Sequence, residues 1–333
     1  MDVWLHTFSF PHRVAEVAKQ AEEWGFTGLL VADSQNLNAD IWVELALAGA
    51  ATERLLLGPG VTNPVTRHPA VTASAAATLQ AETGGRAVLG LGRGDSAVTQ
   101  LGMRPVPPAA LERLLVTMQA YLRGETVDVD GVPTQIRWLT GSGAPKVPVV
   151  VAATGPQAIA VGARHAEALD FTVGAEHDRL RWAIGTAHRA GGARSDMLSL
   201  GAFVNVGVHP DRVVARDLVR GSTAIFARFA AEGAPSEGLS EVTRRGIGRL
   251  AAGYRAASHG QAAAPQARDL EDEFIDRFAV AGPPAEVAER LNDLASLGLR
   301  RVVVVPGSLD ADPSLLQESN RRFASEVLPA LMG

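Results

Sequence analysis

Short apolar runs alternate along the chain with longer stretches in which apolar residues recur every three or four positions. The continuous runs predict buried parallel strands, because a strand covered on both faces has no need of alternating polar residues. They fall at residues 3–8, 28–32, 55–59, 87–91, 147–152 and 168–173, with two more at 198–208 and 301–306.

The stretches between these runs predict amphipathic helices. Residues 11–24 place Val14, Val17, Ala18 and Ala21 on one helical face, and a proline stands near the predicted helix start. The same pattern predicts helices at residues 40–52, 69–82, 108–122, 156–166 and 176–191.

About eight strand–helix units predict an α/β fold of the (β/α)8 TIM-barrel type, with residues 1–333 as a single domain. A doubly wound open sheet is the alternative, but its G-x-G-x-x-G fingerprint is missing, since Gly90, Gly92 and Gly94 are spaced G-x-G-x-G. Two segments interrupt the alternation and are interpreted as insertions. Residues 123–146 predict a β-hairpin turning at Asp130-Gly131, and residues 209–278 predict extra helices over the barrel mouth.

Composition narrows the classes of function. The net charge is −5 and the basic residues are scattered, which disfavours nucleic acid as a partner. The chain has no cysteine, so thiolate chemistry and Cys-ligated metals are excluded, and its eight histidines lack the spacing of metal ligands. No apolar run reaches the roughly 20 residues of a membrane span, and the N-terminus has no signal-peptide pattern. We expect a soluble, cytoplasmic protein without a metal and without a membrane partner.

In a (β/α)8 barrel the residues after each strand form the active site. His6 near the end of the first strand would point into the centre of the mouth, although a histidine satisfied inside the barrel is equally consistent with this position. Asp33 follows the second strand, where it serves either chemistry or the turn. The other strand-end candidates are Ser34, Gly92, Arg93, Gly94 and Ala153.

The segment after the fifth strand suggests an anion site. Thr154 and Gly155 precede Pro156 at a predicted helix start, which leaves free N–H groups that favour a phosphate, with Gln157 beside them. An ordinary turn capped by Thr154 is the simpler interpretation. For Arg67 and His68, before the helix-opening Pro69, a structural role in the loop competes with a functional one.

Two strings then indicate a family. GPGVTNPVTRHPAVTASAAATLQ (58–80) and GGRAVLGLGRGDSAV (84–98) resemble the bacterial luciferase-like superfamily, and look closest to the coenzyme F420-dependent methylenetetrahydromethanopterin reductases. AATGPQAIAVGARHAEALDFTVGAEHDRLRWAI (152–184) is similar to the phosphate-loop region of that branch. The resemblance implies a homodimeric barrel that binds F420, or alternatively FMN, across its mouth.

The resemblance also implies roles for residues. Gly60 and Val61 would be joined by a non-proline cis peptide bond whose bulge backs the cofactor ring. Thr62 and Asn63 would hydrogen-bond the ring, and Asp33 would lie near its polar edge. The site for the cofactor phosphate would be formed by Thr154, Gly155, Pro156 and Gln157.

The chain also departs from its relatives. The reductases have a carboxylate near the end of the first strand, where this chain has His6 or Thr7. The sugar-phosphate dehydrogenases have an Asp-His pair where Asp33-Ser34 stands here, and their glutamate after the fourth strand is not matched. The proton donor is therefore open, with His6 the first hypothesis and Asp33 the second.

The function expected from these observations is hydride transfer between F420 and a small organic molecule, such as an imine, enone or ketone. Two alternatives stay open at this stage. One is an FMN-dependent monooxygenase that uses reduced flavin and O2. The other is a non-catalytic flavin-binding barrel.

Overall fold

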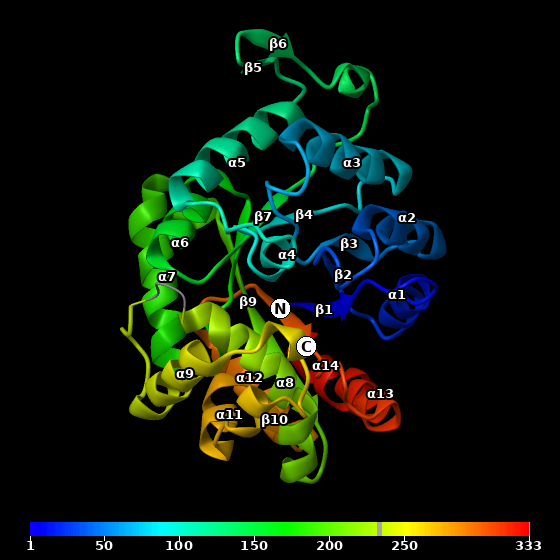
Figure 1. The fold of residues 1–333 in the computed structure, drawn as a ribbon. Helices are drawn as coiled ribbons and strands as arrows, with labels where there is room; N and C mark the ends of the chain where they lie inside the picture. Colours follow the sequence, from blue (N-terminus) through cyan, green and yellow to red (C-terminus); the bar gives the residue numbers. More distant parts are fainter. Residues whose placement is uncertain (232–234, 333) are drawn as a thin grey trace.

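Eight parallel strands form a nearly closed barrel in the computed structural model, which describes residues 1–231 and 235–332 (Figure 1). The strand order is β3-β2-β1-β11-β9-β8-β7-β4, and single bridges from Leu57 to Ala87 and from Thr62 to Leu91 join β3 to the β4 side. The barrel strands are β1 (Asp2–Phe8), β2 (Gly28–Ala32), β3 (Leu56–Pro59), β4 (Leu89–Leu91), β7 (Val149–Ala153), β8 (Ala168–Phe171), β9 (Ser199–Val208) and β11 (Arg301–Val305). The predicted TIM barrel is confirmed.

Helices surround the barrel and follow its strands in sequence. They are α1 (Val14–Glu23), α2 (Ile41–Ala51), α3 (Pro69–Glu82), α4 (Ser96–Thr99), α5 (Pro108–Leu122), α6 (Pro156–His165), α7 (His177–Gly191), α8 (Arg212–Ala231), α9 (Glu241–Gly253), α10 (Pro265–Arg268), α11 (Asp272–Phe278), α12 (Pro284–Ser296), α13 (Pro313–Arg322) and α14 (Leu328–Met332). The two chain ends meet, since the Met1 ammonium donates to the carbonyl oxygen of Leu331 at 3.3 Å (Figure 1).

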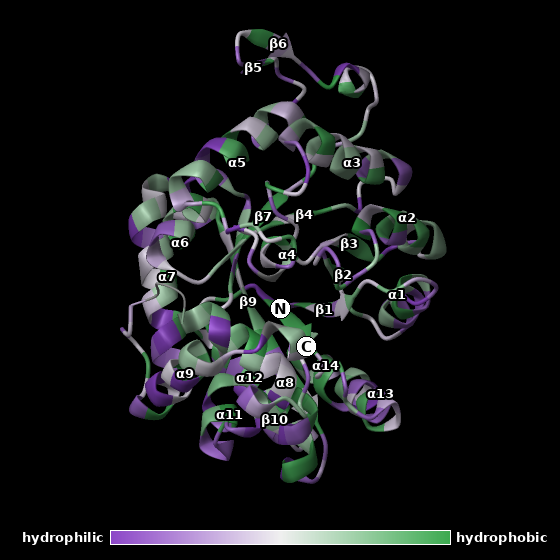
Figure 2. Ribbon diagram, in the orientation of Figure 1, coloured by the Kyte–Doolittle hydropathy of each residue, from purple (hydrophilic) through white to green (hydrophobic). Residues whose placement is uncertain are grey.

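Strand side chains alternate between the barrel interior and the surrounding helices. On β1, Val3 and Leu5 belong to the cluster under the helices, whereas Trp4 belongs to the interior cluster. Val302 and Val303 on β11 divide in the same way. The strands are apolar on both faces for this reason, and Figure 2 shows them as a largely hydrophobic centre.

An ion pair lies inside the barrel. Arg301 on β11 donates from Nη2 and Nε to Asp170 Oδ1 on β8, at 2.7 and 3.1 Å, and both side chains are buried. The Arg301 guanidinium also lies 5.2 Å from the Trp4 ring centre. The pair joins two strands that β9 separates in the sheet.

The first interruption contains the predicted hairpin. Strands β5 (Val127–Val129) and β6 (Val132–Thr134) pair antiparallel, and they project from the barrel beyond α5 (Figure 1). The turn residues Asp130 and Gly131 have φ of 51° and 83°, as a two-residue hairpin turn of type I′ requires.

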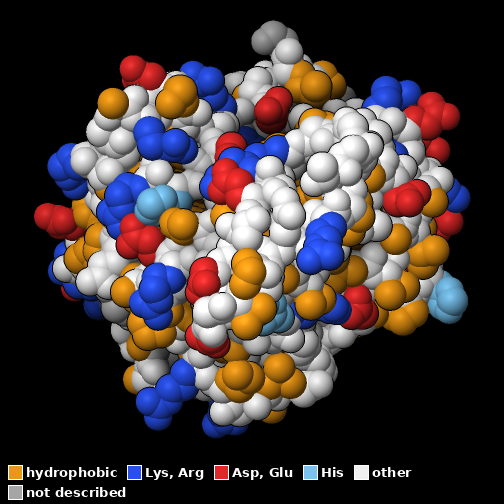
Figure 3. Space-filling view, turned by 90° about the horizontal axis from the view of Figure 1, so that it is seen from above, with side chains coloured by type: hydrophobic (Ala, Val, Ile, Leu, Met, Phe, Trp, Pro, Cys, Tyr) orange, Lys and Arg blue, Asp and Glu red, His pale blue; other side chains and the backbone are white. Residues whose placement is uncertain are grey.

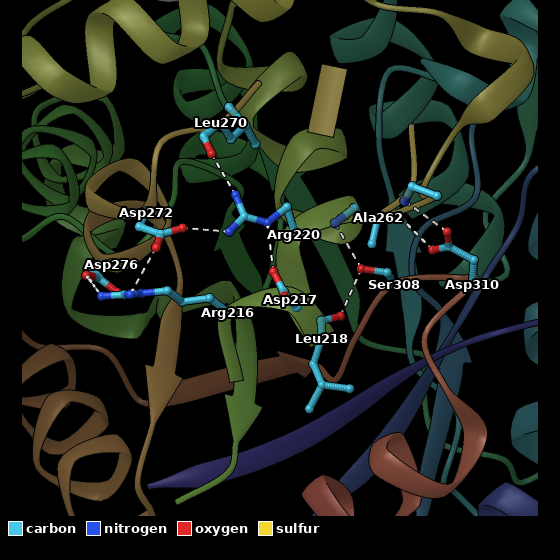
Figure 4. Close-up of polar contacts among 12 residues, drawn as sticks. Arg216, Asp217, Leu218, Arg220, Ala262, Leu270, Asp272, Asp276, Ser308 and Asp310 are labelled. Atoms are coloured by element: carbon cyan, nitrogen blue, oxygen red, sulfur yellow. Dashed lines mark hydrogen bonds and ion pairs between the residues drawn. The ribbon is translucent and has the colours of Figure 1, made fainter. Parts of the chain in front are cut away.

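The second interruption is helical in the part that the structure describes, with α8 to α11 falling between β9 and β10. Arginines of α8 bind α11: Arg216 contacts Asp272 and Asp276, and Arg220 contacts Asp272 at 2.7 Å (Figure 4). The short strand β10 (Val280–Gly282) pairs with the carboxyl-terminal residues of β9. It was not among the predicted strands.

Candidate active site

A cavity of about 500 Å3 opens at the carboxyl ends of the barrel strands. Its size is within the range of cofactor and substrate sites. The structure brings together on its wall all the strand-end and cofactor-site candidates from the sequence, although the role of each stays a prediction. These are His6, Asp33, Ser34, Gly60, Val61, Thr62, Asn63, Gly92, Arg93, Gly94, Ala153, Thr154, Gly155, Pro156 and Gln157.

His6 hydrogen-bonds the bulge at Gly60 and Val61, which follows β3. The peptide bond between Gly60 and Val61 is cis, as the resemblance implies. His6 Nε2 lies 2.9 Å from the Gly60 carbonyl oxygen, so this nitrogen carries the hydrogen and donates it. Burial lowers the pKa of His6 to about 4, which leaves the ring neutral at pH 7. Its single N–H is then committed to Gly60, and its other nitrogen, Nδ1, has no partner among the described residues.

Asp33 is held by two donors at the end of β2. The Thr62 hydroxyl donates to Oδ2 and the Gln35 amide to Oδ1, each at 2.6 Å. Burial raises the pKa of the Asp33 carboxyl, while the hydrogen bond from Thr62 opposes the shift. Because Thr62 spends its hydrogen on Asp33, only its oxygen lone pairs remain to receive a hydrogen bond from a ligand.

Asn63 offers a donor that the protein itself does not use. Its Oδ1 accepts from the backbone N–H groups of Val65 and Thr66 at 2.9 and 3.0 Å, which fixes the direction of the amide. The opposite atom, Nδ2, is buried and has no partner among the residues described. A buried donor without an acceptor is costly, and a ligand carbonyl in this cavity would satisfy it.

The glycines after β4 allow the bulge and this strand to approach each other. A Cβ at Gly92 would lie 2.8 Å from Val61 Cγ2. Gly94 has φ of 76°, and a Cβ there would lie 3.0 Å from Asn63 Cβ. These glycines therefore position Val61 and Asn63. Arg93 between them is tied back, since its Nε donates to the Val106 carbonyl at 2.7 Å.

The start of α6 is open toward the cavity. Its N-cap is Gly155, and no side chain caps it. The Thr154 hydroxyl is instead bonded to that of Thr172 at 2.6 Å, so the simple interpretation of Thr154 as a helix cap is wrong. Within the described chain the N–H groups of Gln157 and Ala158 have no acceptor, which suits an anion at this helix end.

The simpler interpretation is confirmed for Arg67 and His68. His68 caps α3 by accepting the N–H of Ala70 on Nδ1 at 3.2 Å. Arg67 forms an ion pair with Asp40, which caps α2. Neither residue lines the cavity.

The helical insertion, which was predicted to lie over the barrel mouth, supplies a wall of the cavity whose individual residues the sequence analysis did not name. Ser222, Ile225, Phe226 and Phe229 of α8 all line the cavity. Their spacing of three, four and seven residues marks one helical face, and that periodicity was the signal that could have identified them. His259, in the loop after α9, is a further lining residue that nothing local in the sequence singles out.

Other kinds of site find no support in the described part of the chain. Within residues 1–231 and 235–332 no three His, Asp or Glu side chains are grouped so as to hold a metal ion. No described helix is both long and apolar enough to cross a membrane. Figure 3 shows basic and acidic side chains interspersed over the face seen from above.

Comparison with known proteins agrees with this arrangement. A family model described as luciferase-like monooxygenase matches residues 2–301. The chain is 30% identical over 306 residues to a 5,10-methylenetetrahydromethanopterin reductase of Archaeoglobus fulgidus, covering 86% of each protein. It is 29% identical to an F420-dependent glucose-6-phosphate dehydrogenase of Microbacterium testaceum, covering 96% of this chain and 94% of that one.

Solved structures support the same fold. The coenzyme F420-dependent tetrahydromethanopterin reductase of Methanopyrus kandleri superposes with a TM-score of 0.76 at 22% identity, covering 98% of each chain.

Proposed function

The chain belongs to the luciferase-like monooxygenase family, and from this premise we propose that it is an oxidoreductase that transfers a hydride between coenzyme F420 and a small organic acceptor. The acceptor class that we propose is an imine, enone or ketone. The observation that carries the proposal is the cavity itself, in which an unpartnered buried amide donor and an open helix start face one space. Two relatives named for F420 support the choice of cofactor.

The cavity wall offers polar groups that a deazaflavin could use. Asn63 Nδ2 would donate to a ring carbonyl, and the N–H groups of Gln157 and Ala158 would receive the phosphate. Gly60 and Val61 would lie against the ring face. When bound, the cofactor supplies a ring that donates or accepts a hydride.

The protein would contribute orientation and exclusion of water. His6 would fix the Gly60 carbonyl, so that the bulge presents one rigid surface. Phe203, Phe226 and Phe229 would cover the acceptor and keep water from the reacting carbon. Of the two proton donors proposed from the sequence, His6 is the weaker, since its single N–H is committed to Gly60 and its pKa is lowered to about 4, and Asp33 stays the alternative to a donor from the helical insertion.

Titration with the two cofactors tests the proposal directly. F420 and FMN are added separately to the purified protein, and fluorescence and absorbance follow binding. Reduced F420 is then mixed with cyclic imines, enones and ketones in a stopped-flow instrument. We expect micromolar binding of F420 and oxidation of its reduced form by at least one acceptor class. Absence of F420 binding would refute the proposal.

Substitution of Asn63→Asp sharpens the test. The change keeps the oxygen that caps Val65 and Thr66, but replaces the donor with a second acceptor. The variant loses the hydrogen bond to the ring carbonyl, and its carboxylate repels that carbonyl. F420 binding should therefore weaken at least about tenfold, which corresponds to ~1.4 kcal/mol. Asn320→Asp on α13 is the matched control and should bind F420 like the wild type. Equal affinity in all three proteins would contradict the assignment of Asn63.

Because the family is described as luciferase-like monooxygenase, an FMN-dependent monooxygenase is the competing hypothesis. Oxygen consumption is measured with reduced FMN and compared with oxidation of reduced F420. Turnover of O2 with FMN, and none of F420, would replace the proposal with the monooxygenase. Binding of either cofactor without any turnover would favour the non-catalytic barrel.

We also propose that the protein is a homodimer of a single-domain barrel. Apolar side chains stand exposed on neighbouring helices: Val43 and Leu47 on α2 are 59% and 52% exposed, and Val71 on α3 is 51% exposed. Burial of such a face between two copies would remove it from water.

A further inference from the structure

A chain of polar side chains runs from the loop after β4, through the helical insertion, to the cavity wall. Asp95 Oδ1 lies 3.0 Å from Arg228 Nη2 on α8. The Arg228 guanidinium lies 4.7 Å from the centre of the Tyr254 ring, and the Tyr254 hydroxyl lies 2.7 Å from His259 Nδ1. Both ends of this chain, Asp95 and His259, line the cavity.

The chemistry of these groups favours one direction for the hydrogen bonds. A guanidinium has only donors, and Arg228 acts on the Tyr254 hydroxyl through a hydrogen bond as well as through its charge. A hydroxyl that accepts from Arg228 and donates its hydrogen to His259 Nδ1 uses both contacts, and we infer this direction for the 2.7 Å bond. A neutral imidazole that accepts on Nδ1 carries its hydrogen on Nε2. In this tautomer His259, which lines the cavity, carries its N–H on Nε2.

Both groups are uncharged near neutral pH. Burial, helped by the positive charge of Arg228, lowers the pKa of His259 to about 4. Burial also raises the pKa of Tyr254 to about 12, with Arg228 opposing the shift. The pair consequently holds two transferable hydrogens in series, one on Tyr254 and one on His259.

The loop that carries His259 is tied to the barrel. The Asp310 carboxylate, in the loop after β11, accepts the backbone N–H groups of Ala262 and Ala263 at 2.6 and 3.0 Å (Figure 4). The N–H of Leu309 donates to the Gly260 carbonyl at 2.9 Å. The imidazole is therefore placed by the end of a barrel strand, as a preorganised donor requires.

The wall contributed by α8 indicates the chemical class of the acceptor that would bind beside His259. Ile225, Phe226 and Phe229 present an apolar surface, with Phe203 of β9. An acceptor with an apolar body and one hydrogen-bonding atom fits such a wall.

We propose that His259 donates its Nε2–H to the carbonyl oxygen or imine nitrogen of an apolar acceptor, and that Tyr254 supplies the proton through His259 when the acceptor is reduced. This inference rests on the proposed function, because a hydride must reach the acceptor from reduced deazaflavin.

Each atom and electron pair in this reduction has a donor and an acceptor. For a ketone, the hydride adds to the carbonyl carbon and the electron pair of the C=O π bond moves to oxygen. The oxygen takes the hydrogen of His259 Nε2, while Nδ1 takes that of Tyr254. The phenolate left behind is compensated by Arg228 until solvent returns a proton. The ketone would thereby become an alcohol, with the hydride supplied by reduced deazaflavin if that cofactor is bound.

A spectroscopic test needs no cofactor. In uniformly 15N-labelled protein at pH 7, long-range proton–nitrogen correlations report which nitrogen of each histidine carries hydrogen. The His259 signals, identified by their loss in His259→Gln, should show hydrogen on Nε2 in the wild type. In Tyr254→Phe, loss of the donor should shift this tautomer toward a mixture. Hydrogen on Nδ1 in the wild type would overturn the proposal.

Kinetics with reduced F420 give the second test. Tyr254→Phe should lower kcat by about 10²-fold, as loss of a general acid does, while F420 binds within twofold of wild type. His259→Gln keeps an N–H donor but breaks the relay, so kcat should fall with little change in KM. The chain has two tyrosines, and Tyr121→Phe, whose hydroxyl contacts Thr134 near the hairpin, is the matched control.

The outcomes separate the two proposals. A wild type that neither binds F420 nor reduces any acceptor refutes the proposed function, and the relay that depends on it falls as well. An active wild type with Tyr254→Phe at full kcat refutes the relay alone.

Discussion

Acid should destabilise the folded protein through His6, and the substitution His6→Gln tests this. Burial lowers the pKa of His6 from 6.5 to about 4. Between these values the unfolded chain binds a proton that the folded protein does not, so stability increases with pH across this window. The neutral glutamine keeps an N–H for the Gly60 carbonyl and does not titrate.

The size of the effect follows from the pKa difference. Each pKa unit corresponds to about 1.4 kcal/mol, so the full effect of His6 on the free energy of unfolding is about 3 kcal/mol below pH 4. At pH 5 about 2 kcal/mol of it is already present, whereas at pH 7 it is close to zero. His6 is buried in the folded state, with 5% of its surface exposed, so solvent screening does not reduce the effect much.

Urea unfolding at pH 5, 6 and 7 measures the difference. Carboxylates also lose favourable partners in acid, but the wild type and His6→Gln share this loss, so it cancels between them. The stability advantage of His6→Gln over the wild type should grow by about 2 kcal/mol from pH 7 to pH 5. His188→Gln, at an exposed position on α7, is the control. A change below about 0.5 kcal/mol would refute a neutral, buried His6.

Two further predictions concern the barrel and its assembly. Asp170→Ala leaves the Arg301 charge buried without its partner and should lower the free energy of unfolding by about 3–5 kcal/mol. The apolar double variant Asp170→Leu/Arg301→Met should lose less, because no buried charge remains. Urea unfolding measures both variants, and equal losses would contradict an uncompensated charge as the cause. If the proposed homodimer forms through the exposed face of α2, Leu47→Glu should give a monomer in light scattering, while Met197→Glu, at a site 74% exposed elsewhere, should not change the mass from that of the wild type. A dimer that persists in Leu47→Glu would exclude this face.

Local sequence was sufficient for most of the fold. Parallel strands are buried on both faces, so β2 and β7 are continuous apolar runs, and prolines mark the starts of α3, α5 and α6. Asp130-Gly131 carries its own turn conformation. The strand β10, three residues between two helices, was not predicted.

Some residues of the candidate site could likewise be predicted from local sequence, and others could not. Residues that directly follow a strand, such as Asp33 and Thr154, were found because a barrel brings strand ends together whatever their distance in sequence. The wall from α8 carried a readable helical period, but nothing in that period says which element it faces.

What the sequence by itself determined was the order of strands and helices, the hairpin turn and the strand-end residues, because these depend on neighbours within a few positions. Only the tertiary structure decided which polar groups are buried and which partners they have. Burial set the pKa of His6 and its bond to Gly60, and packing of the insertion over the mouth joined Asp95 to Arg228, more than a hundred residues away in the chain. Desolvation and hydrogen-bond partners are properties of the assembled barrel, which no local pattern of residues contains.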